Sequence, residues 1–318
     1  MKIKPWKWIK WCFYLFILLF IGSNFIIYNH AYYFTHFVDK DLPKLTSEEI
    51  DKKTFWEKIK IGVYGVEIAK PRNKIQPDSS FKTISLGKSP RLDAWWIPTS
   101  LPPKGVVILF HGYSANKSSQ LEQARVLRKL GYHTFLVDFR GHGDSEGFQT
   151  SIGYHEALDV QRAYQYIRTY HDLPISLLGT SMGAVSILKA MQDYQLDVEK
   201  LILECPFGSL KDAVYSRFEN LNIPQVLLPE LLLFWGGIQN NMNSWEHNAV
   251  NYARSIKVPT LIIYGEQDPK VRKHEIDAVF NALSNQRRLS IFKNAGHDHI
   301  MQDAPQAWTK AVWSFLEL

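Results

Sequence analysis

The stretch LLGTSMGA, from Leu177 to Ala184, places Ser181 between Gly179 and Gly183 in a G-x-S-x-G pattern. A strand-to-helix turn can hold such a serine with its hydroxyl exposed above a sheet, and glycine fits on either side because the turn is tight. A glycine-rich turn without catalysis has the same pattern. The apolar run before the motif and the helical run after it favour Ser181 as a nucleophile.

A serine hydroxyl needs a base, usually histidine, and an acid that orients the base. In a parallel sheet of this kind the chain order is serine, acid, histidine. Asp268 follows the apolar run PTLIIYG (259–265), and His297 follows LSIFK (289–293). Both residues therefore lie past the carboxyl ends of predicted strands, where open α/β sheets place their sites. We predict a triad of Ser181, Asp268 and His297.

Other residues compete for these roles. Glu204 and Glu266 are alternative acids, since each lies at or just past the end of a predicted strand, and His299 is an alternative base. His297 is preferred to His299 because a glycine directly precedes it and permits a tight turn. His142 and His155 come before the serine in the chain, so we interpret them as structural histidines.

An acyl-transfer site also needs two N–H donors for the oxyanion. The residue after the nucleophile, Met182, supplies one. The segment HGYS (111–114) directly follows an apolar strand, and Tyr113 is our prediction for the second donor, with Gly112 and Ser114 as alternatives. We interpret His111 as a residue that packs the loop.

The elements that must position these residues alternate along the chain. Apolar strand-like runs at 106–110, 133–139, 175–179, 201–205, 259–265 and 289–293 are separated by helical patterns. The runs FKTISL and RLDAWWIP predict a β-hairpin at 81–98. This alternation predicts an α/β fold in which a mostly parallel central sheet is entered through an antiparallel hairpin and covered by helices on both faces.

One region interrupts the alternation. Residues 208–258 contain no clear strand but include the apolar stretch IPQVLLPELLLFWGGI (223–238). This region is either an ordinary helix packed on the sheet or a small helical cap over the catalytic face. As a cap it would line an acyl pocket, for which the candidates are Leu227, Leu231, Phe234 and Trp235.

The N-terminal segment has the composition of a membrane anchor. No Asp, Glu, Lys or Arg occurs from Trp11 to Val38, and the stretch is long enough to cross about 30 Å of hydrocarbon as a helix. Aromatic residues mark both ends, and four lysines precede the stretch, which predicts a cytoplasmic N-terminus and an extracytoplasmic (periplasmic or lumenal) catalytic domain. A cleaved signal peptide is the alternative, although no good cleavage site follows.

The predicted organisation has three parts. Residues 1–38 form a cytoplasmic tip and a single transmembrane helix, residues 39–80 a stalk and domain edge, and residues 81–318 the catalytic domain. The 318-residue chain has a net charge of +6, but four of its lysines lie in the first ten residues. No basic stripe for nucleic acid follows from this distribution. Cys12 and Cys205 are not expected to pair, and the oligomeric state is not predicted.

Five segments together carry a family resemblance: HGYS (111–114), DFRGHGDSEG (138–147), GTSMG (179–183), GEQD (265–268) and AGH (295–297). With them the chain resembles the α/β-hydrolase family over roughly residues 80–318. The second segment resembles that of the membrane-anchored ABHD12/ABHD13-like lipases and the serine aminopeptidase-like lysophospholipases. The resemblance implies a serine hydrolase without metal or cofactor, in which Asp138 and Arg140 brace the site. The inserted region is smaller than the lid of large-lid lipases.

These observations predict a hydrolase that cleaves a carboxylic ester through an acyl-enzyme on Ser181. A lipid acyl ester, such as a monoacylglycerol or lysophospholipid, fits the predicted anchor. A serine peptidase or amidase would use the same triad, and a non-catalytic membrane-tethered scaffold is the alternative from another functional class.

Overall fold

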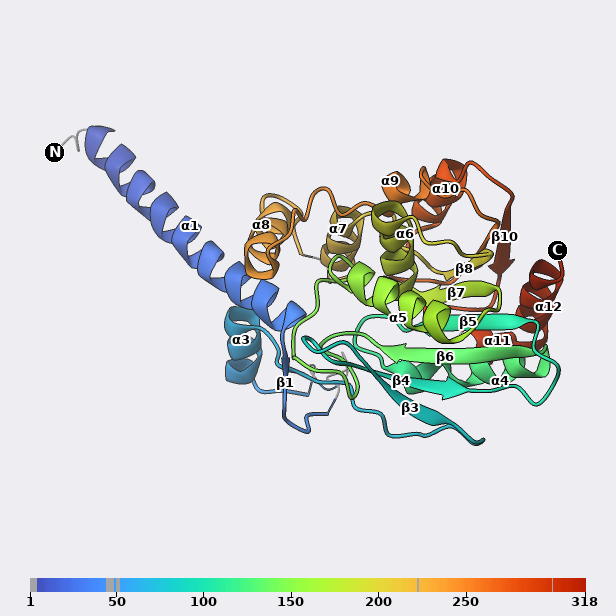
Figure 1. Cartoon of the computed structure of the whole chain (residues 1–318). Coiled ribbons are helices and arrows are strands. Elements are labelled where there is room, and N and C mark those ends of the chain that lie inside the picture. The colour runs from blue at the N-terminus through green and yellow to red at the C-terminus, as the bar shows by residue number, and fades with distance from the viewer. Residues whose placement is uncertain (1–4, 44–48, 50–51, 222, 299) are drawn as a thin grey trace.

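The computed structural model describes residues 5–43, 49, 52–221, 223–298 and 300–318. Its centre is an eight-stranded sheet with the strand order β10-β9-β8-β7-β5-β6-β4-β3 (Figure 1). The strands are β3 (Lys82–Leu86), β4 (Leu92–Ile97), β5 (Gly105–Phe110), β6 (Tyr132–Asp138), β7 (Ile175–Thr180), β8 (Lys200–Glu204), β9 (Thr260–Gly265) and β10 (Arg287–Phe292).

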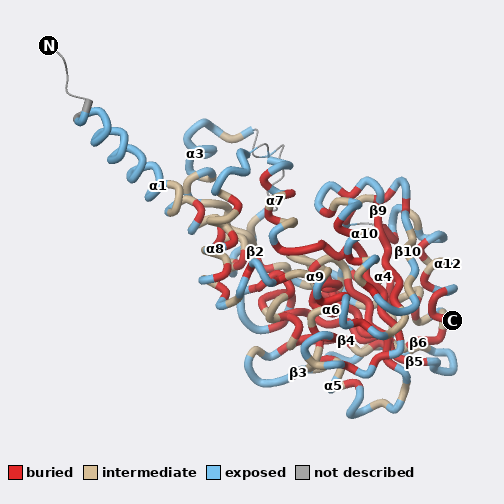
Figure 2. The backbone as a smooth tube through the Cα atoms, turned by 90° about the horizontal axis from the view of Figure 1, so that it is seen from above, coloured by how far each residue is buried: buried red, intermediate tan, exposed pale blue. Residues whose placement is uncertain are grey.

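Only the β3–β4 and β4–β6 pairs are antiparallel, and the other five pairs of the large sheet are parallel. Strands β5, β8 and β9 are buried along their whole length, as expected for strands covered on both faces. Figure 2 shows this buried centre surrounded by more exposed segments. The structure thus confirms the predicted mostly parallel sheet with its antiparallel hairpin.

Helices cover both faces of the sheet. Helices α5 and α6 lie on one face, and α4, α11 and α12 lie on the other (Figure 1). The helices that connect the strands or follow the last one are α4 (Leu121–Lys129), α5 (Glu156–Tyr170), α6 (Met182–Tyr194), α10 (Lys273–Ala282), α11 (Ile300–Asp303) and α12 (Pro305–Leu316). The 3-10 turn η1 (Lys117–Gln120) directly precedes α4.

The region between β8 and β9 forms three helices, α7 (Leu210–Asn220), α8 (Leu228–Asn240) and α9 (Ala249–Ala253). Its described residues contain no strand, as predicted. Helix α8 does not lie on the sheet: its main helix contact is with the N-terminal helix α1 (Pro5–Thr35), and α7 packs on its other side (Figure 1).

Helix α1 extends away from the rest of the chain for most of its length (Figures 1 and 2). Its 31 residues are about 46 Å long, and the segment Trp8–Thr35 is long and apolar enough to cross a membrane by length and composition. Its last turns contact other elements, chiefly α8 and the short helix α3 (Phe55–Tyr64). After α1, β1 (Phe37–Val38) pairs in parallel with β2 (Ile68–Ala69).

Candidate active site

Ser181 occupies a strained turn between β7 and α6. Its φ of 52° lies in the left-handed region, which costs a non-glycine residue of the order of 1–3 kcal/mol. Its neighbours leave no room for side chains: a Cβ atom on Gly179 would lie 2.5 Å from the carbonyl carbon of Gly183, and one on Gly183 would lie 2.2 Å from the carbonyl oxygen of Phe110. The Ser181 N–H donates to the Glu204 carbonyl oxygen, which anchors the turn to the end of β8.

The three predicted triad residues meet at the carboxyl edge of the sheet. Ser181 follows β7, Asp268 follows β9 and His297 follows β10, so the parallel strands bring their loops to the same edge. His297 Nδ1 lies 2.6 Å from Asp268 Oδ2, and His297 Nε2 lies 2.9 Å from Ser181 Oγ. The side chains of His297 and Asp268 are buried, and Ser181 is partly exposed.

The Asp268 carboxylate is held in its ionised form. Burial pushes its pKa upward, but the hydrogen bond and charge of His297, with the backbone N–H groups of Val271 and Lys270, lower the pKa overall below its usual value. Those two N–H groups donate to Oδ1 at 2.9 and 2.7 Å, which leaves Oδ2 for the imidazole. Because a carboxylate only accepts, His297 Nδ1 carries the hydrogen and Nε2 is free to accept from the Ser181 hydroxyl.

The two competing acids have other environments. Glu204 accepts from Thr180 Oγ1 and Trp308 Nε1 at 2.7 and 2.6 Å, and burial raises the pKa of its carboxyl. Glu266 is exposed, and His299 lies outside the described residues.

The two upstream histidines have packing roles, as interpreted. Burial and the neighbouring His111 lower the pKa of His142 to about 3, and His142 Nδ1 lies 2.9 Å from the Arg140 carbonyl oxygen. His155 Nε2 lies 2.8 Å from the Asn240 carbonyl oxygen. His111 accepts from the Phe139 N–H through Nε2 at 3.1 Å and is fully buried.

The loop after β5 lies directly against the nucleophile. A Cβ atom on Gly112 would lie 3.6 Å from Ser181 Cβ, so this backbone passes the serine at van der Waals distance. Among the hydrogen bonds of the described residues, none uses the backbone N–H of Tyr113 or Met182. The two predicted oxyanion donors thus have no protein acceptor within the described parts of the chain.

Tyr113 also contacts the end of α1, a link that no sequence pattern indicated. Its hydroxyl donates to the Phe34 carbonyl oxygen at 2.7 Å, and the two rings stack at 4.8 Å between centroids. The Arg217 guanidinium of α7 lies 4.7 Å from the centre of the Phe34 ring. Phe37 packs at 4.9 Å against the ring of His142. The last residues of α1, and Phe37 after it, therefore contact residues in the loops beside the candidate site.

The four residues predicted to bind an acyl chain, Leu227 just before α8 and three within it, have different environments. Leu227 and Phe234 are exposed, and Leu231 is partly buried against the core. Trp235 packs on α1: its Nε1 donates to Asn24 Oδ1 at 3.1 Å, and its ring meets that of Tyr28 edge-on at 5.2 Å.

A second buried charged cluster lies beside the loop 138–147. The Lys117 ammonium is fully buried and contacts the carboxylates of Asp93, Asp138 and Asp144. It also lies 4.4 Å from the centre of the Trp95 ring. These three carboxylates have the separation of a metal-binding group, but the lysine occupies the position that a cation would take. Sequence analysis missed Lys117, because a single lysine in a loop has no diagnostic spacing.

The contacts of Asp138 and Arg140 are of the bracing kind that the family resemblance implied. Asp138 accepts from the backbone N–H of Lys117 and of Asp144, which ties two loops together. Arg140 forms an ion pair with the buried Asp159 of α5 at 2.7 Å.

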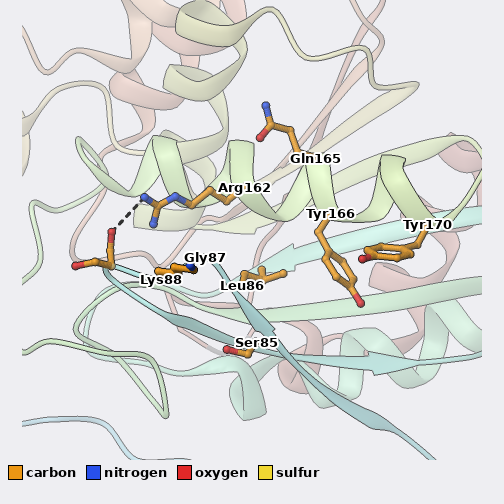
Figure 3. Close-up of a pocket in the computed structure, with 9 residues that line it drawn as sticks. Ser85, Leu86, Gly87, Lys88, Arg162, Gln165, Tyr166 and Tyr170 are labelled. Atoms are coloured by element: carbon orange, nitrogen blue, oxygen red, sulfur yellow. Dashed lines mark hydrogen bonds between the residues drawn. The ribbon is translucent and has the colours of Figure 1, made fainter.

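Two further features of the molecule resemble binding sites. Cys205, Asp268 and His297 have potential metal-ligand atoms within 4.8 Å of one another. Asp268 and His297, however, are already hydrogen-bonded to each other. An open groove of about 690 Å³ lies between the β3–β4 turn and α5, where Arg162, Tyr166 and Tyr170 project toward it (Figure 3). Arg162 bonds the carbonyl oxygens of Ser89 and Pro90. None of the triad residues lines this groove.

Comparison with known proteins gives consistent matches. The family model described as Hydrolase_4, serine aminopeptidase, S33, matches residues 101–252, a range that contains the Ser181 turn. The protein YqkD of Bacillus subtilis is 24% identical over 66% of this chain and 70% of its own length. The lysophosphatidylserine lipase ABHD12 of Mus musculus is 25% identical over 63% of this chain. The matched part is about half (51%) of the lipase's length.

Solved structures share the fold. The esterase Pf2001 of Pyrococcus furiosus superposes with a TM-score of 0.64 over 78% of this chain and 97% of its own, at 22% identity. A membrane phospholipase A, described as a bacterial virulence factor, superposes with a TM-score of 0.56 over 75% of this chain and 86% of its own, at 20% identity.

Proposed function

We propose that the chain is a membrane-anchored serine esterase of the α/β-hydrolase family, with Ser181 as its nucleophile. The observation that supports the proposal most directly is the continuous hydrogen-bonded chain from Asp268 through His297 to Ser181 Oγ. Each link has the length and the donor direction that general-base activation of a serine requires.

In the proposed reaction, Ser181 Oγ attacks the ester carbonyl carbon while His297 Nε2 takes the hydroxyl proton. The resulting imidazolium lies against the ionised Asp268, which stabilises its charge and holds its orientation. His297 then gives the proton to the alcohol oxygen, the carbon–oxygen bond breaks, and the alcohol leaves. Water repeats the sequence on the acyl-enzyme and releases the carboxylic acid with Ser181 restored.

The oxyanion formed at each tetrahedral stage is proposed to bind the N–H groups of Met182 and Tyr113. Neither N–H group has a protein acceptor among the described residues. Met182 directly follows Ser181 in the chain, and Tyr113 lies in the loop after β5 that passes Ser181. Met182 is also the first residue of α6, where the helix dipole favours a negative charge.

We propose a lipid acyl ester, such as a monoacylglycerol or lysophospholipid, as the substrate. The names of two similar proteins, a lysophosphatidylserine lipase and a membrane phospholipase A, support this class. Leu227, just before α8, and Leu231 and Phe234 within it are the proposed contacts of the acyl chain, and Trp235 links this segment to α1.

We further propose that α1 is an uncleaved anchor with its N-terminus in the cytoplasm and the catalytic domain on the other side. The contacts of Asn24 and Tyr28 with α8 and of His30 with α3 support retention, because cleavage near residue 31 would remove all three. A topology reporter fused after Leu318 is expected to report an extracytoplasmic position. A cytoplasmic signal would contradict the proposed orientation.

The nucleophile is tested with a fluorophosphonate probe and with soluble p-nitrophenyl esters of short acids on the detergent-solubilised full chain. The probe is expected to label the wild type, and Ser181→Ala is expected to abolish labelling and to lower ester turnover by about 10⁴-fold or more. Ser186→Ala is the matched control: this serine lies one helical turn on, and its hydroxyl bonds the Met182 carbonyl oxygen. Equal turnover by wild type and Ser181→Ala would reject the proposal.

The description of the matching family model as a serine aminopeptidase makes peptide hydrolysis the second candidate. The same triad would cleave an amide, so the substrates must decide. Turnover of aminoacyl p-nitroanilides in excess of matched p-nitrophenyl esters would favour the peptidase. We expect ester cleavage to dominate.

A further inference from the structure

Two helices beside the end of α1 expose apolar side chains. Helix α3 contains no buried residue, although its sequence FWEKIKIGVY is rich in aromatic and branched residues. Trp56 is 75% exposed, and Phe55 and Tyr64 are exposed as well. On α8, Phe234 and Ile238 are exposed, Ile238 at 57%. We call these five side chains the collar.

Both helices contact the same stretch of α1. From α3, the Gly62 carbonyl oxygen lies 2.9 Å from His30 Nε2, and the Tyr64 ring meets the Phe25 ring edge-on. From α8, Gln239 Nε2 donates to the Tyr28 carbonyl oxygen at 3.0 Å. Figure 1 shows α3 and α8 beside the domain-proximal part of α1. The two helices that carry the collar therefore both contact α1 within residues 24–30.

This stretch is where the hydrocarbon would end. A hydrocarbon core of about 30 Å takes about 20 residues of helix, so a span that starts at Trp8 ends near Tyr28. Tryptophan and tyrosine favour the interface at this depth, and lysine side chains can extend from it toward water. Helix α3 carries Lys58 and Lys60 between its apolar residues. This mixture of exposed aromatic and basic side chains fits a membrane interface.

We propose that the collar is a membrane-binding surface that lies in the headgroup region of the leaflet where α1 ends. The inference rests on the anchor role of α1 in the proposed function. A bilayer fits better than a second protein because the collar continues the lipid-facing surface of α1, whose residues from Trp11 to Ile21 are exposed and carry no charge. The collar is an interfacial surface of amphipathic helices, bound through apolar area rather than through pairwise contacts.

The collar also fixes the position of the candidate site relative to the membrane. Asn240 at the end of α8 donates to Thr35 Oγ1, and Phe34 next to it accepts from the Tyr113 hydroxyl. Tyr113 lies in the loop that passes Ser181. The substrate class that fits this placement is a single-chain acyl ester resident in the bilayer, whose acyl group reaches the site without crossing bulk water.

Depth-dependent quenching tests the surface without relying on activity. The full chain is prepared with Cys12→Ser, which leaves only the buried Cys205. Trp56→Cys and Ile238→Cys are each labelled with a fluorophore and reconstituted in phosphatidylcholine vesicles that carry a nitroxide high on the acyl chain. Trp313→Cys is the matched control: Trp313 is 51% exposed on α12, on the side of the molecule away from α1 (Figure 1).

We expect lipid nitroxides to quench the labels at 56 and 238 and to leave the label at 313 unaffected. Labels at 56 and 238 that stay unquenched would overturn the proposal. If those labels are shielded from water as well as from lipid, the collar binds protein, and the proposal is equally overturned.

Charge substitutions test the consequence for the substrate. The double variant Trp56→Glu with Ile238→Glu is compared with Trp313→Glu on monoacylglycerol in phosphatidylcholine vesicles and on a soluble p-nitrophenyl ester. A charge at the interface weakens membrane binding by up to about fivefold for each site. For the double variant we therefore expect a fall of about fivefold on vesicles with soluble-ester turnover unchanged, and no change in the control. An equal fall on both substrates, or none on vesicles, would contradict the proposed role. Activity of Ser181→Ala would reject the proposed function and leave the quenching result intact.

Discussion

Two buried acidic clusters lie close to the carboxyl edge of the sheet, and they differ in what the carboxylate faces. Asp268 faces an imidazole whose second nitrogen reaches the partly exposed Ser181 hydroxyl. Asp138 faces the ammonium of Lys117, which is enclosed by carboxylates and by the Trp95 ring. The comparison indicates that burial of charge is not enough for chemistry. The partner must exchange a proton near neutral pH and reach a group that a substrate can approach.

The charge states within the Lys117 cluster support a structural role. Burial lowers the pKa of Lys117, but its carboxylate neighbours, led by Asp138, outweigh this and raise the pKa overall. Burial raises the pKa of Asp138, but Lys117 and His111 bring it below the usual value. The pair is therefore a fixed ion pair at neutral pH, whereas the triad is arranged to move a proton.

The largest effect that separates the two clusters is expected for Asp268→Asn. An amide donates a hydrogen to His297 Nδ1 where the carboxylate accepted one, so the imidazole is held in the wrong tautomer. We expect kcat on a soluble ester to fall by about 10⁴-fold, with the urea unfolding midpoint changed little. Asp298→Asn changes an exposed neighbour that pairs with Lys270, and it should retain activity. Near-normal turnover by Asp268→Asn would remove Asp268 from the triad.

The next effect is on stability, in the other cluster. Lys117→Met keeps the length of the side chain but leaves buried carboxylates without their cation. Loss of one partner of a buried ion pair costs about 3–5 kcal/mol, so we expect a correspondingly lower free energy of unfolding in urea. Lys104→Met, which breaks an exposed pair with Glu317, should cost less than about 1 kcal/mol. Similar losses in the two variants would show that the Lys117 cluster is not structural.

The ion pair of Asp138 with Lys117 should also make the free energy of unfolding depend on pH at the acid end. The folded pKa of Asp138 lies below its unfolded value of about 4, so between these two values the unfolded chain binds more protons. Stability then rises with pH in that window: the contribution is complete above about pH 4 and is lost as pH falls through the folded pKa. In Lys117→Met the main cause of the lowered pKa is gone, so the acid-side loss should shrink. An unchanged urea midpoint profile between pH 3 and 6 would contradict this assignment.

The position of a site residue can be predicted from the sequence when strand order places it, but not when contacts with distant segments place it. Ser181, Asp268 and His297 follow strands, and parallel strands bring their carboxyl ends together whatever the loop details. Their convergence was therefore predictable from chain order and hydrophobic pattern. The central strands were predictable as well, because the buried apolar runs of β5, β8 and β9 are continuous.

The remaining features depend on contacts between segments that are distant in sequence. The packing of α8 on α1 joins residues about 200 positions apart, and its apolar sequence fits a cap, a core helix or a helix partner equally well. Neither Phe34 nor Lys117 belongs to a spaced pattern. One practical consequence concerns a soluble domain cut near residue 40: it would lack the Phe34 carbonyl that accepts from Tyr113. Assays are better made on the full chain.

The smallest predicted effect concerns this link between α1 and the candidate site. Tyr113→Phe removes the hydroxyl that donates to Phe34 while keeping the ring stack. A hydrogen bond of this kind contributes about 0.5–1.5 kcal/mol, so we expect the free energy of unfolding to fall by about 1 kcal/mol. Because the same residue supplies the proposed oxyanion N–H, we also expect kcat to fall a few-fold while KM is unchanged.

A double-mutant cycle separates positioning from plain stability. Phe34→Ala removes the ring against which Tyr113 stacks, so its effect on kcat should not add to that of Tyr113→Phe, because both loosen the same loop. Tyr215→Phe is the control, since its hydroxyl bonds Glu230 between α7 and α8, away from the triad. It should leave kcat unchanged. Strict additivity of the two site variants would mean that the end of α1 supports the fold of the domain without positioning the loop beside Ser181.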